Sequence, residues 1–202
     1  MFNKHRILLT LLIVLSLVLV ACGGDAEGDG DNSDSGDAIA LTQNTTTDEP
    51  VTGGTLSVDY PEGWFAESAG GAIILADSEE ALASQQDGAE EGQVLSSVSF
   101  LSTEMVSSMA GEGELTPLSV LQVFSSEAGD EVNMGEPEET TIGGNSAALV
   151  TATDDSADTM VIIIEVEGGY ILVAGTTGLG EMASARPTIE AIAGSVVYTP
   201  AE

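Results

Sequence analysis

A predicted β-hairpin in the last third of the chain constrains the fold most. Residues 159–167 are strongly apolar through Val161–Ile164, and Gly168-Gly169 separates them from a second apolar run, Tyr170–Thr176. A Gly-Gly pair tolerates the positive φ angles of a two-residue primed turn. A strand with an unbroken apolar centre is typical of the middle of a sheet that is covered on both faces. We therefore expect residues 159–167 to form a central, fully covered strand.

Other elements are predicted around this hairpin. Short or alternating apolar runs indicate strands over 54–60, 72–76, 94–101, 132–141 (interrupted by Gly135 and Pro137) and 147–153. Helices are indicated over 78–86 with Asp77 or Ser78 as cap, from Pro117 with Thr116 as cap, and from Pro187 with Ile189, Ile192 and Val196 facing inward. This order predicts an α+β fold, in which a mainly antiparallel sheet is flanked by two or three helices.

The N-terminus has the three parts of a secretory signal. Lys4, His5 and Arg6 form a short basic region, and Ile7–Ala21 is apolar except for two hydroxyl residues. This apolar run is shorter than the ~20 residues that a membrane-spanning helix needs, and it matches the central region of a cleaved signal peptide. We therefore interpret residues 1–21 as a signal peptide that is absent from the mature chain.

The segment Leu19-Val20-Ala21-Cys22 resembles the lipobox of bacterial lipoproteins, and Cys22 is the only cysteine. The resemblance implies that Cys22 becomes the first mature residue and carries a diacylglycerol thioether, often with a further acyl chain such as palmitate. Two or three acyl chains hold a protein firmly on a membrane. We expect an extracytoplasmic, lipid-anchored protein of the cell membrane, with the outer membrane or cell surface open because Gly23 follows the cysteine. An uncleaved anchor and a plain secreted protein are the alternatives.

Charge excludes several classes of function. The chain has 34 acidic and 3 basic residues and a net charge of -31. Cleavage before Cys22 removes Lys4, His5 and Arg6, which leaves Arg186 as the only strong base. Catalysis that needs an imidazole, a lysine or a free thiol is then excluded, as are the usual zinc sites and nucleic-acid binding. We expect no catalytic residues, no metal and no cofactor.

Two carboxylate-based alternatives stay open. Paired carboxylates could perform glycoside hydrolysis, and oxygen ligands could make a low-affinity calcium-binding module. The acidic residues otherwise serve solubility or adaptation to salt, or they form an acidic binding face. Residues 22–51 are rich in Gly, Asp and Thr and predict a disordered acidic linker, which leaves residues 52–202 as a single domain.

The domain resembles the PsbP-like family. The run Leu56–Trp64 is similar to the "strand, Tyr-Pro-x-Gly-Trp" opening of that family, and Ile142–Ala147 is similar to its turn before a strand. The resemblance implies an extracytoplasmic domain without catalytic activity. Plant PsbP proteins dock on photosystem II partly through lysines, and because no lysine follows residue 4 that function is not carried over.

Two side chains are weak candidates for ligand binding. Trp64 is the only tryptophan, and we interpret it either as a core residue or as a platform on which a ligand binds. Arg186 offers either a surface ion pair or a clamp for a carboxylate or another anion. Together with Cys22, these residues predict a non-enzymatic binding or structural protein of the cell envelope, with the membrane and an envelope protein as partners.

Overall fold

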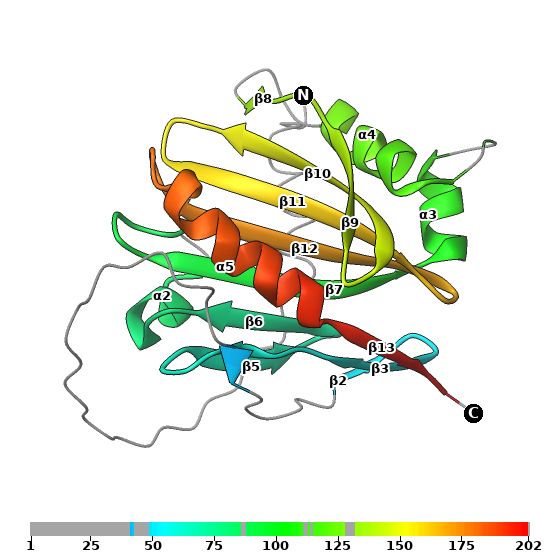
Figure 1. Ribbon diagram of the computed structural model, residues 1–202, viewed down its shortest axis with the longest axis horizontal. Coiled ribbons are helices and arrows are strands. Elements are labelled where there is room, and N and C mark those ends of the chain that lie inside the picture. Colours follow the sequence, from blue (N-terminus) through cyan, green and yellow to red (C-terminus); the bar gives the residue numbers. More distant parts are fainter. Residues whose placement is uncertain are drawn as a thin grey trace, which may run out of the picture.

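The structure is a computed structural model that describes residues 41–42, 49–85, 88–110, 113, 115–127 and 132–201 (Figure 1). The predicted signal peptide, Cys22 and most of the predicted linker lie outside the described residues. No helix within the described ranges is long and apolar enough to cross a membrane.

An antiparallel sheet of eight strands forms the centre of the domain, in the order β5-β6-β7-β12-β11-β10-β8, with β9 also paired to β10. The strands are β5 (Phe65–Ala69), β6 (Ala72–Ala76), β7 (Val94–Ser102), β8 (Asn133–Met134), β9 (Glu138–Ile142), β10 (Asn145–Thr153), β11 (Ala157–Val166) and β12 (Gly169–Gly178). The described helices are α2 (Glu79–Ala83), α3 (Thr103–Ala110), α4 (Pro117–Glu127) and α5 (Met182–Ser195). The predicted α+β class is confirmed, although the described residues hold four helices rather than two or three.

The β11–β12 hairpin forms where the sequence predicts it, but its turn lies one residue earlier. Val166 pairs with Gly169, so Glu167 and Gly168 make the turn, and Gly168 has a φ of 81°. Gly169 belongs to strand β12 instead. A glycine is needed there because a methyl group at this position would collide with the carbonyl oxygen of Leu101 on β7. The first glycine therefore serves the turn, and the second serves the close approach of two strands.

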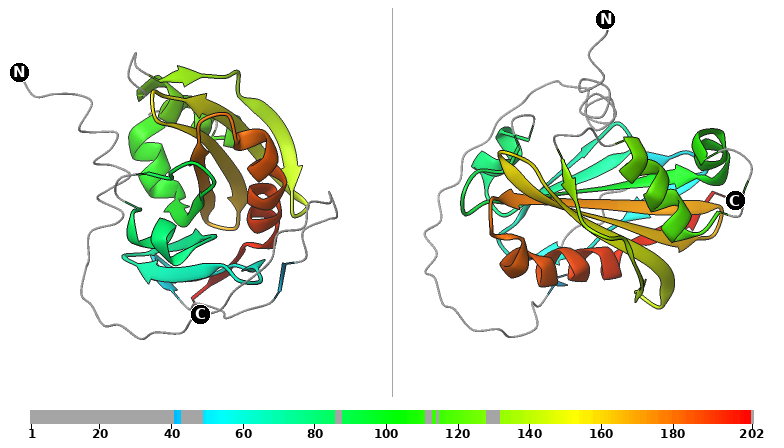
Figure 2. Two further views of the ribbon diagram at one scale, coloured as in Figure 1. Left: turned by 90° about the vertical axis from the view of Figure 1, so that its left-hand side faces the viewer. Right: turned by 90° about the horizontal axis from the view of Figure 1, so that it is seen from above.

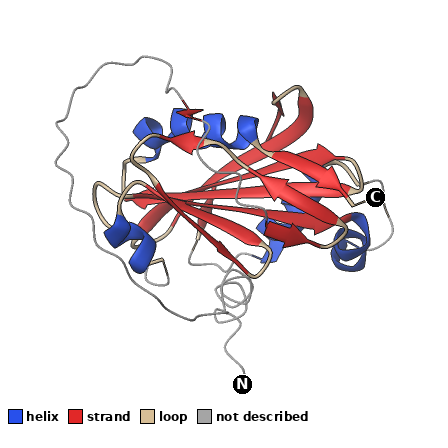
Figure 3. Cartoon of the chain, turned by 90° about the horizontal axis from the view of Figure 1, so that it is seen from below, coloured by secondary structure: helices blue, strands red, loops and turns tan. Residues whose placement is uncertain are grey.

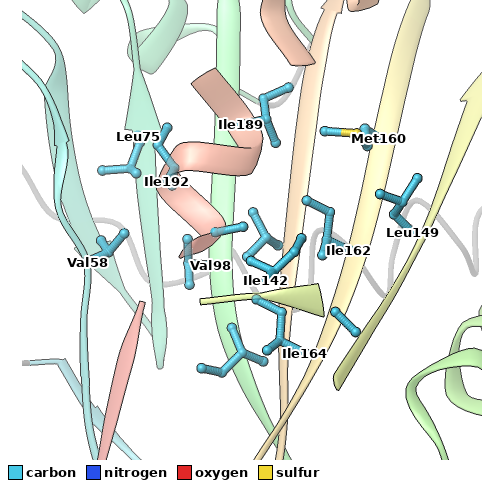
Figure 4. Packing of buried hydrophobic residues seen from close by; sticks show 14 of the residues in the cluster. Val58, Leu75, Val98, Ile142, Leu149, Met160, Ile162, Ile164, Ile189 and Ile192 are labelled. Atoms are coloured by element: carbon cyan, nitrogen blue, oxygen red, sulfur yellow. The ribbon is translucent and has the colours of Figure 1, made fainter. Parts of the chain in front are cut away.

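Helices cover both faces of the sheet (Figure 2). Helix α5 lies on one face, and α2, α3 and α4 lie on the other. The cluster under α5 includes Ile162, Ile189 and Ile192, all fully buried, and Figure 4 shows how they pack against neighbouring strands. Ile163 points the other way, into a second cluster with α3 and α4. The prediction that β11 is covered on both faces is thus confirmed.

Helix α5 begins earlier than predicted. It starts at Met182, and Pro187 lies inside it. A proline inside a helix removes one backbone hydrogen bond. Here Met182 and Ala185 extend the buried stripe by more than a turn toward the N-terminus, and their burial outweighs that loss. The caps of the other two predicted helices are confirmed, since Ser78 Oγ accepts from Ala81 N at 3.1 Å and Thr116 Oγ1 accepts from Ser119 N at 3.2 Å.

A smaller sheet lies beside the main one (Figure 1), and Figure 3 shows the strands of the domain, in red, from below. It has the order β13-β3-β2 and consists of β2 (Glu49–Val51), β3 (Gly54–Ser57) and β13 (Val197–Pro200). The predicted strand over 54–60 is split into β3 and β4 (Tyr60–Pro61), and β4 pairs with β1 (Leu41–Thr42). Strands β1 and β2 lie inside the range that composition assigns to the linker, because pairing with a distant strand leaves no mark on local composition.

Candidate binding surface

The sheet face opposite α5 carries the candidate site. Directly opposed residues of antiparallel strands share a face. Ile74 pairs with Ser97, which pairs with Ala174, and in the next row Ser99 pairs with Leu172. We call the patch across the adjacent strands β6, β7 and β12 the serine face. It consists of Ile74, Leu95, Ser97, Ser99, Leu172 and Ala174.

The two faces of the sheet differ in exposure at this point. On β7, Ser96 and Val98 point toward α5 and are 1% and 0% exposed. Leu95 and Ser97, which point to the serine face, are half-buried, as is Leu172 on β12. One side of the sheet is therefore closed by α5. On the other side Leu95, Ser97 and Leu172 stay partly accessible, whereas Ile74, Ser99 and Ala174 are buried.

Ser99 lies in this patch with an unpartnered hydroxyl. Its side chain is 2% exposed, and its Oγ has no hydrogen-bond partner. Leaving a buried hydroxyl without a partner costs about 1–3 kcal/mol, so such a group needs an explanation. Ser96 Oγ is also unpartnered, but it lies on the closed side under α5. Ser68 Oγ and Asp77 Oδ1 are buried without a hydrogen-bond partner as well, and the Ser99 hydroxyl is itself closed off from the accessible part of the patch.

Acidic residues surround the serine face. Glu67 on β5 is paired with Ile74, and Glu165 on β11 is paired with Tyr170, so both carboxylates start from this face of the sheet. Helices α2 and α3, which lie on the same side, add exposed carboxylates. These are Glu79, Glu80 and Glu104. The electrostatic potential around the patch is therefore strongly negative.

Exposed apolar side chains border the same face. Phe65 on the edge strand β5 is paired with Ala76 and is 40% exposed. Met105 and Met109 lie one turn apart on α3 and are 47% and 37% exposed, while Val106 of the same helix is buried. Methionine is common on surfaces that bind other proteins, because its side chain adapts its shape.

The structure places the sequence-predicted candidates elsewhere. Trp64 is half-buried and packs against the cluster under α5, next to the turn that Gly63 makes with a φ of 83°. Arg186 Nε donates to Glu190 Oε1 at 2.7 Å on the outside of α5, and the two side chains are 41% and 38% exposed. The pair is an i,i+4 ion pair on a helix surface. Cys22 lies outside the described residues.

Carboxylates gather at one end of the sheet, where they hold loops. Asp77 Oδ2 accepts from Val94 N at 2.8 Å, and Glu181 Oε2 accepts from Gly92 N at 2.9 Å. Burial, with a smaller contribution from the charge of Glu181, raises the pKa of Asp77. Asp158 accepts from Gly180 N at 2.7 Å. Within the described ranges, no three His, Cys, Asp or Glu residues lie close enough to hold a metal ion.

Sequence reasoning did not identify the serine face. Four serines within β7 (Ser96, Ser97, Ser99 and Ser102) were the available signal, because small polar residues are unusual in the middle of a large sheet.

No protein-family model matches the chain, and no curated protein matches it. Solved structures do resemble it. The solution structure of cyanobacterial PsbP from Synechocystis sp. PCC 6803 is 13% identical, covers 83% of this chain and 98% of its own, and has a TM-score of 0.44. A protein of unknown function from Pseudomonas aeruginosa, described as a putative regulator, is 13% identical over 72% of this chain and 99% of its own, with a TM-score of 0.43.

LpqN of Mycobacterium tuberculosis, described as involved in cell envelope biogenesis, is 12% identical over 73% of this chain and 86% of its own, with a TM-score of 0.37. Likenesses at this level assign neither a family nor a function. The function proposed below rests on the residues of this chain.

Proposed function

We propose that this protein is a lipid-anchored, extracytoplasmic binding domain of the cell envelope that works without catalysis. The observation that supports the binding role is the serine face, on which Leu95, Ser97 and Leu172 stay partly accessible in the middle of the sheet. The opposite side of the same sheet is closed by α5, so the domain has one face suited to a partner.

The N-terminal sequence supports the proposed anchor. The lipobox ending at Cys22 would place acyl chains at the start of the mature chain, and residues 23–40 would connect them to β1. A flexible chain of this length has a root-mean-square span of about 20–25 Å. The tether would thus let the domain search for partners near the membrane surface.

Composition supports the proposal that the protein works without catalysis. After Cys22 the sequence contains no histidine and no lysine, and the carboxylates at the end of the sheet are engaged with backbone N–H groups of loops. The hydrolase and calcium alternatives therefore gain no support from the arrangement of these acids.

Membrane fractionation tests the anchor. The unmodified protein should sediment with membranes and incorporate a palmitate label, whereas Cys22→Ala should release it and abolish labelling. Ser35→Ala, in the same acidic segment, is the matched control and should behave like the unmodified protein. Membrane retention of Cys22→Ala without label would contradict lipid anchoring.

Crosslinking in intact cells tests the binding role. A photo-crosslinking residue at position 97 should trap an envelope protein, and excess unlipidated chain should compete with the product. The same residue at position 183, exposed on α5, is the control and should trap far less. Equal products at both positions would argue against a defined binding face.

A further inference from the structure

We propose that strand β5 binds an extended segment of a partner protein, which adds to the main sheet as a further strand. The inference goes beyond the serine face, because it concerns the edge of the sheet rather than the side chains on its surface. Two observations carry it. One is the direction of the main-chain groups of β5, and the other is a difference between this edge and the other sheet edges.

Register fixes which main-chain groups of β5 point away from the sheet. Among the described strands β5 pairs only with β6 (Figure 1), and Ala69 pairs with Ala72 across a two-residue turn. A pair that closes such a turn exchanges two hydrogen bonds, and bonded and non-bonded pairs then alternate along the strands. Counted back from Ala69, every second residue bonds to β6. The residues between them, Ala66 and Ser68, therefore direct their N–H and C=O groups outward.

These four outward groups are unpaired. Within the described ranges, no main-chain hydrogen bond reaches Ala66 or Ser68 from outside the sheet. Both residues are half-buried, while their neighbours Phe65 and Glu67 are exposed. Main-chain N–H and C=O groups are strong hydrogen-bonding groups, and an extended peptide offers a matching row of them. Two donors and two acceptors on β5 thus form a template for one added strand.

Prolines interrupt the edges of the small sheet. Val51 closes a two-residue turn at the end of β2, so Pro50 before it points outward. Ala201 N donates to Gly53 O at 2.8 Å, so Pro200 before it points outward from β13. A proline has no N–H to donate to an added strand. Both edges of this sheet therefore lack an outward donor at these positions.

The far edge of the main sheet carries similar features. Pro137 lies directly before β9, and the exposed Glu138 and Glu139 are the first two residues of that strand. Natural proteins use prolines and charges on edge strands to prevent pairing with other chains. Strand β5 contains no proline and a single acid, Glu67, and its exposed Phe65 adds an apolar contact. It is thus the least protected edge of the two larger sheets.

The unpaired groups favour an extended segment of another protein over other occupants. A helix satisfies its main-chain groups internally, and an acyl chain has none. In the symmetric antiparallel pairing of two copies that uses all four groups, Glu67 would face Glu67 of the second copy. Like charges directly opposite each other destabilise a strand pair. The partner segment therefore has a neutral or basic residue opposite Glu67, and a β-branched or aromatic residue opposite Phe65.

Amide hydrogen exchange locates the added strand. The sample is the mature chain with Cys22→Ser, which has no lipid, and the probe is the acetylated and amidated peptide Thr-Val-Lys-Val-Val. In the free chain, the amides of Ala66 and Ser68 should exchange faster than that of Glu67. Millimolar peptide should slow exchange at Ala66 and Ser68 by about tenfold or more and leave Thr141, which points outward on β9, unchanged. Unchanged exchange at Ala66 and Ser68 would overturn the inference.

Methylated peptides test whether main-chain hydrogen bonds hold the probe. With its lysine opposite Glu67, the valines on either side of that lysine direct their N–H groups toward β5. N-methylation of both valines should weaken binding by about tenfold or more, whereas N-methylation of the lysine, whose N–H points away, should change it by less than about twofold. Equal weakening by the two modifications would contradict strand addition.

A proline on β5 tests the same bonds from the side of the protein. Ser68→Pro removes an outward N–H without removing a bond to β6, and Ser68→Ala keeps that N–H as the matched control. We expect Ser68→Pro to weaken peptide binding by about threefold or more, and Ser68→Ala by less than about twofold. Full binding by Ser68→Pro, shown to be folded by urea unfolding, would overturn the inference.

The serine face and the edge of β5 are tested separately. Crosslinking at position 97 reports on the serine face, and none of the peptide experiments depends on its result. If Ser68→Pro does not fold, the methylated peptides still decide the question on the chain without that change. Failure of lipid anchoring leaves these results unchanged as well, because the sample has no lipid.

Discussion

The rings of Phe100 and Tyr198 are stacked, with centroids 4.1 Å apart and planes inclined by 4°. The contact joins β7 of the main sheet to β13 of the small sheet. A glycine lies close to each ring, since a methyl group at Gly54 would lie 2.8 Å from the Tyr198 ring and one at Gly169 would lie 2.9 Å from the Phe100 ring. Aromatic rings packed on glycines are a known means of stabilising sheets.

Removal of the Tyr198 ring should weaken the attachment of the small sheet. We expect Tyr198→Ala to lower the free energy of unfolding by about 2 kcal/mol, because it removes a stacked, half-buried ring. Tyr198→Phe should be almost neutral, since the hydroxyl reaches Thr52 O only at 3.5 Å. Urea unfolding measures both variants. A loss in Tyr198→Phe equal to that in Tyr198→Ala would show that the hydroxyl, not the stacking, is the important part.

Gly175 sets how closely α5 approaches β12. A methyl group there would lie 2.7 and 2.8 Å from Ile189 Cγ1 and Cγ2, and Ile189 is fully buried. We expect Gly175→Ala to destabilise the protein by about 1–3 kcal/mol through overpacking. Combining it with Ile189→Val should cost less than the sum of the two single changes in a double-mutant cycle. Additive losses would contradict direct contact as the cause.

Local signals predicted part of the fold accurately. Strand β6 has the predicted bounds, and Ser78 and Thr116 cap the predicted helices, because these elements depend on apolar runs and caps within a few residues. Helix α3 and strands β5 and β13 were not predicted. Phe65–Ala69 alternates weakly, and Val197–Pro200 is a strand only because it pairs with β3, more than a hundred residues earlier.

The binding surface could not be derived in the same way. The serine face exists because register aligns Ile74 with Ser97 and Ser97 with Ala174, across segments separated by up to a hundred residues. Sequence analysis instead selected Trp64, the only tryptophan, and Arg186, the only strong base after residue 6. Rarity in composition carries no information on which sheet face stays accessible.

The ion pair of Arg186 should contribute little to stability. Both side chains are more than a third exposed, and exposed i,i+4 pairs are worth about 0.3–0.5 kcal/mol. We expect Arg186→Ala to change the free energy of unfolding by no more than about this amount, with the difference shrinking in high salt. Glu190→Ala is the matched control and should behave alike. A much larger effect of Arg186→Ala alone would point to a further role for the guanidinium.

Asp77 and Asp154 have opposite pKa shifts. Burial, helped by the charge of Glu181, raises the pKa of Asp77 above its usual 3.8 despite the hydrogen bond from Val94. Burial acts in the same direction on Asp154, but hydrogen bonds from Ser156 and Ala157 outweigh it and lower the pKa of that carboxyl. Relative to the unfolded chain, the native state therefore stabilises the protonated form of Asp77 and the ionised form of Asp154.

This difference predicts opposite pH dependences for two isosteric variants. The contribution of Asp77 to stability is fully present below its unfolded-state pKa and is lost as the pH rises through its higher native pKa. Relative to the unmodified protein, Asp77→Asn should therefore gain stability between pH 3 and pH 7, as measured by urea unfolding. The contribution of Asp154 is present above its unfolded-state pKa and is lost as the pH falls through its lower native pKa, so Asp154→Asn should lose relative stability over the same interval. Parallel trends in the two variants would show that net charge, rather than the local environment of each carboxyl, controls the response.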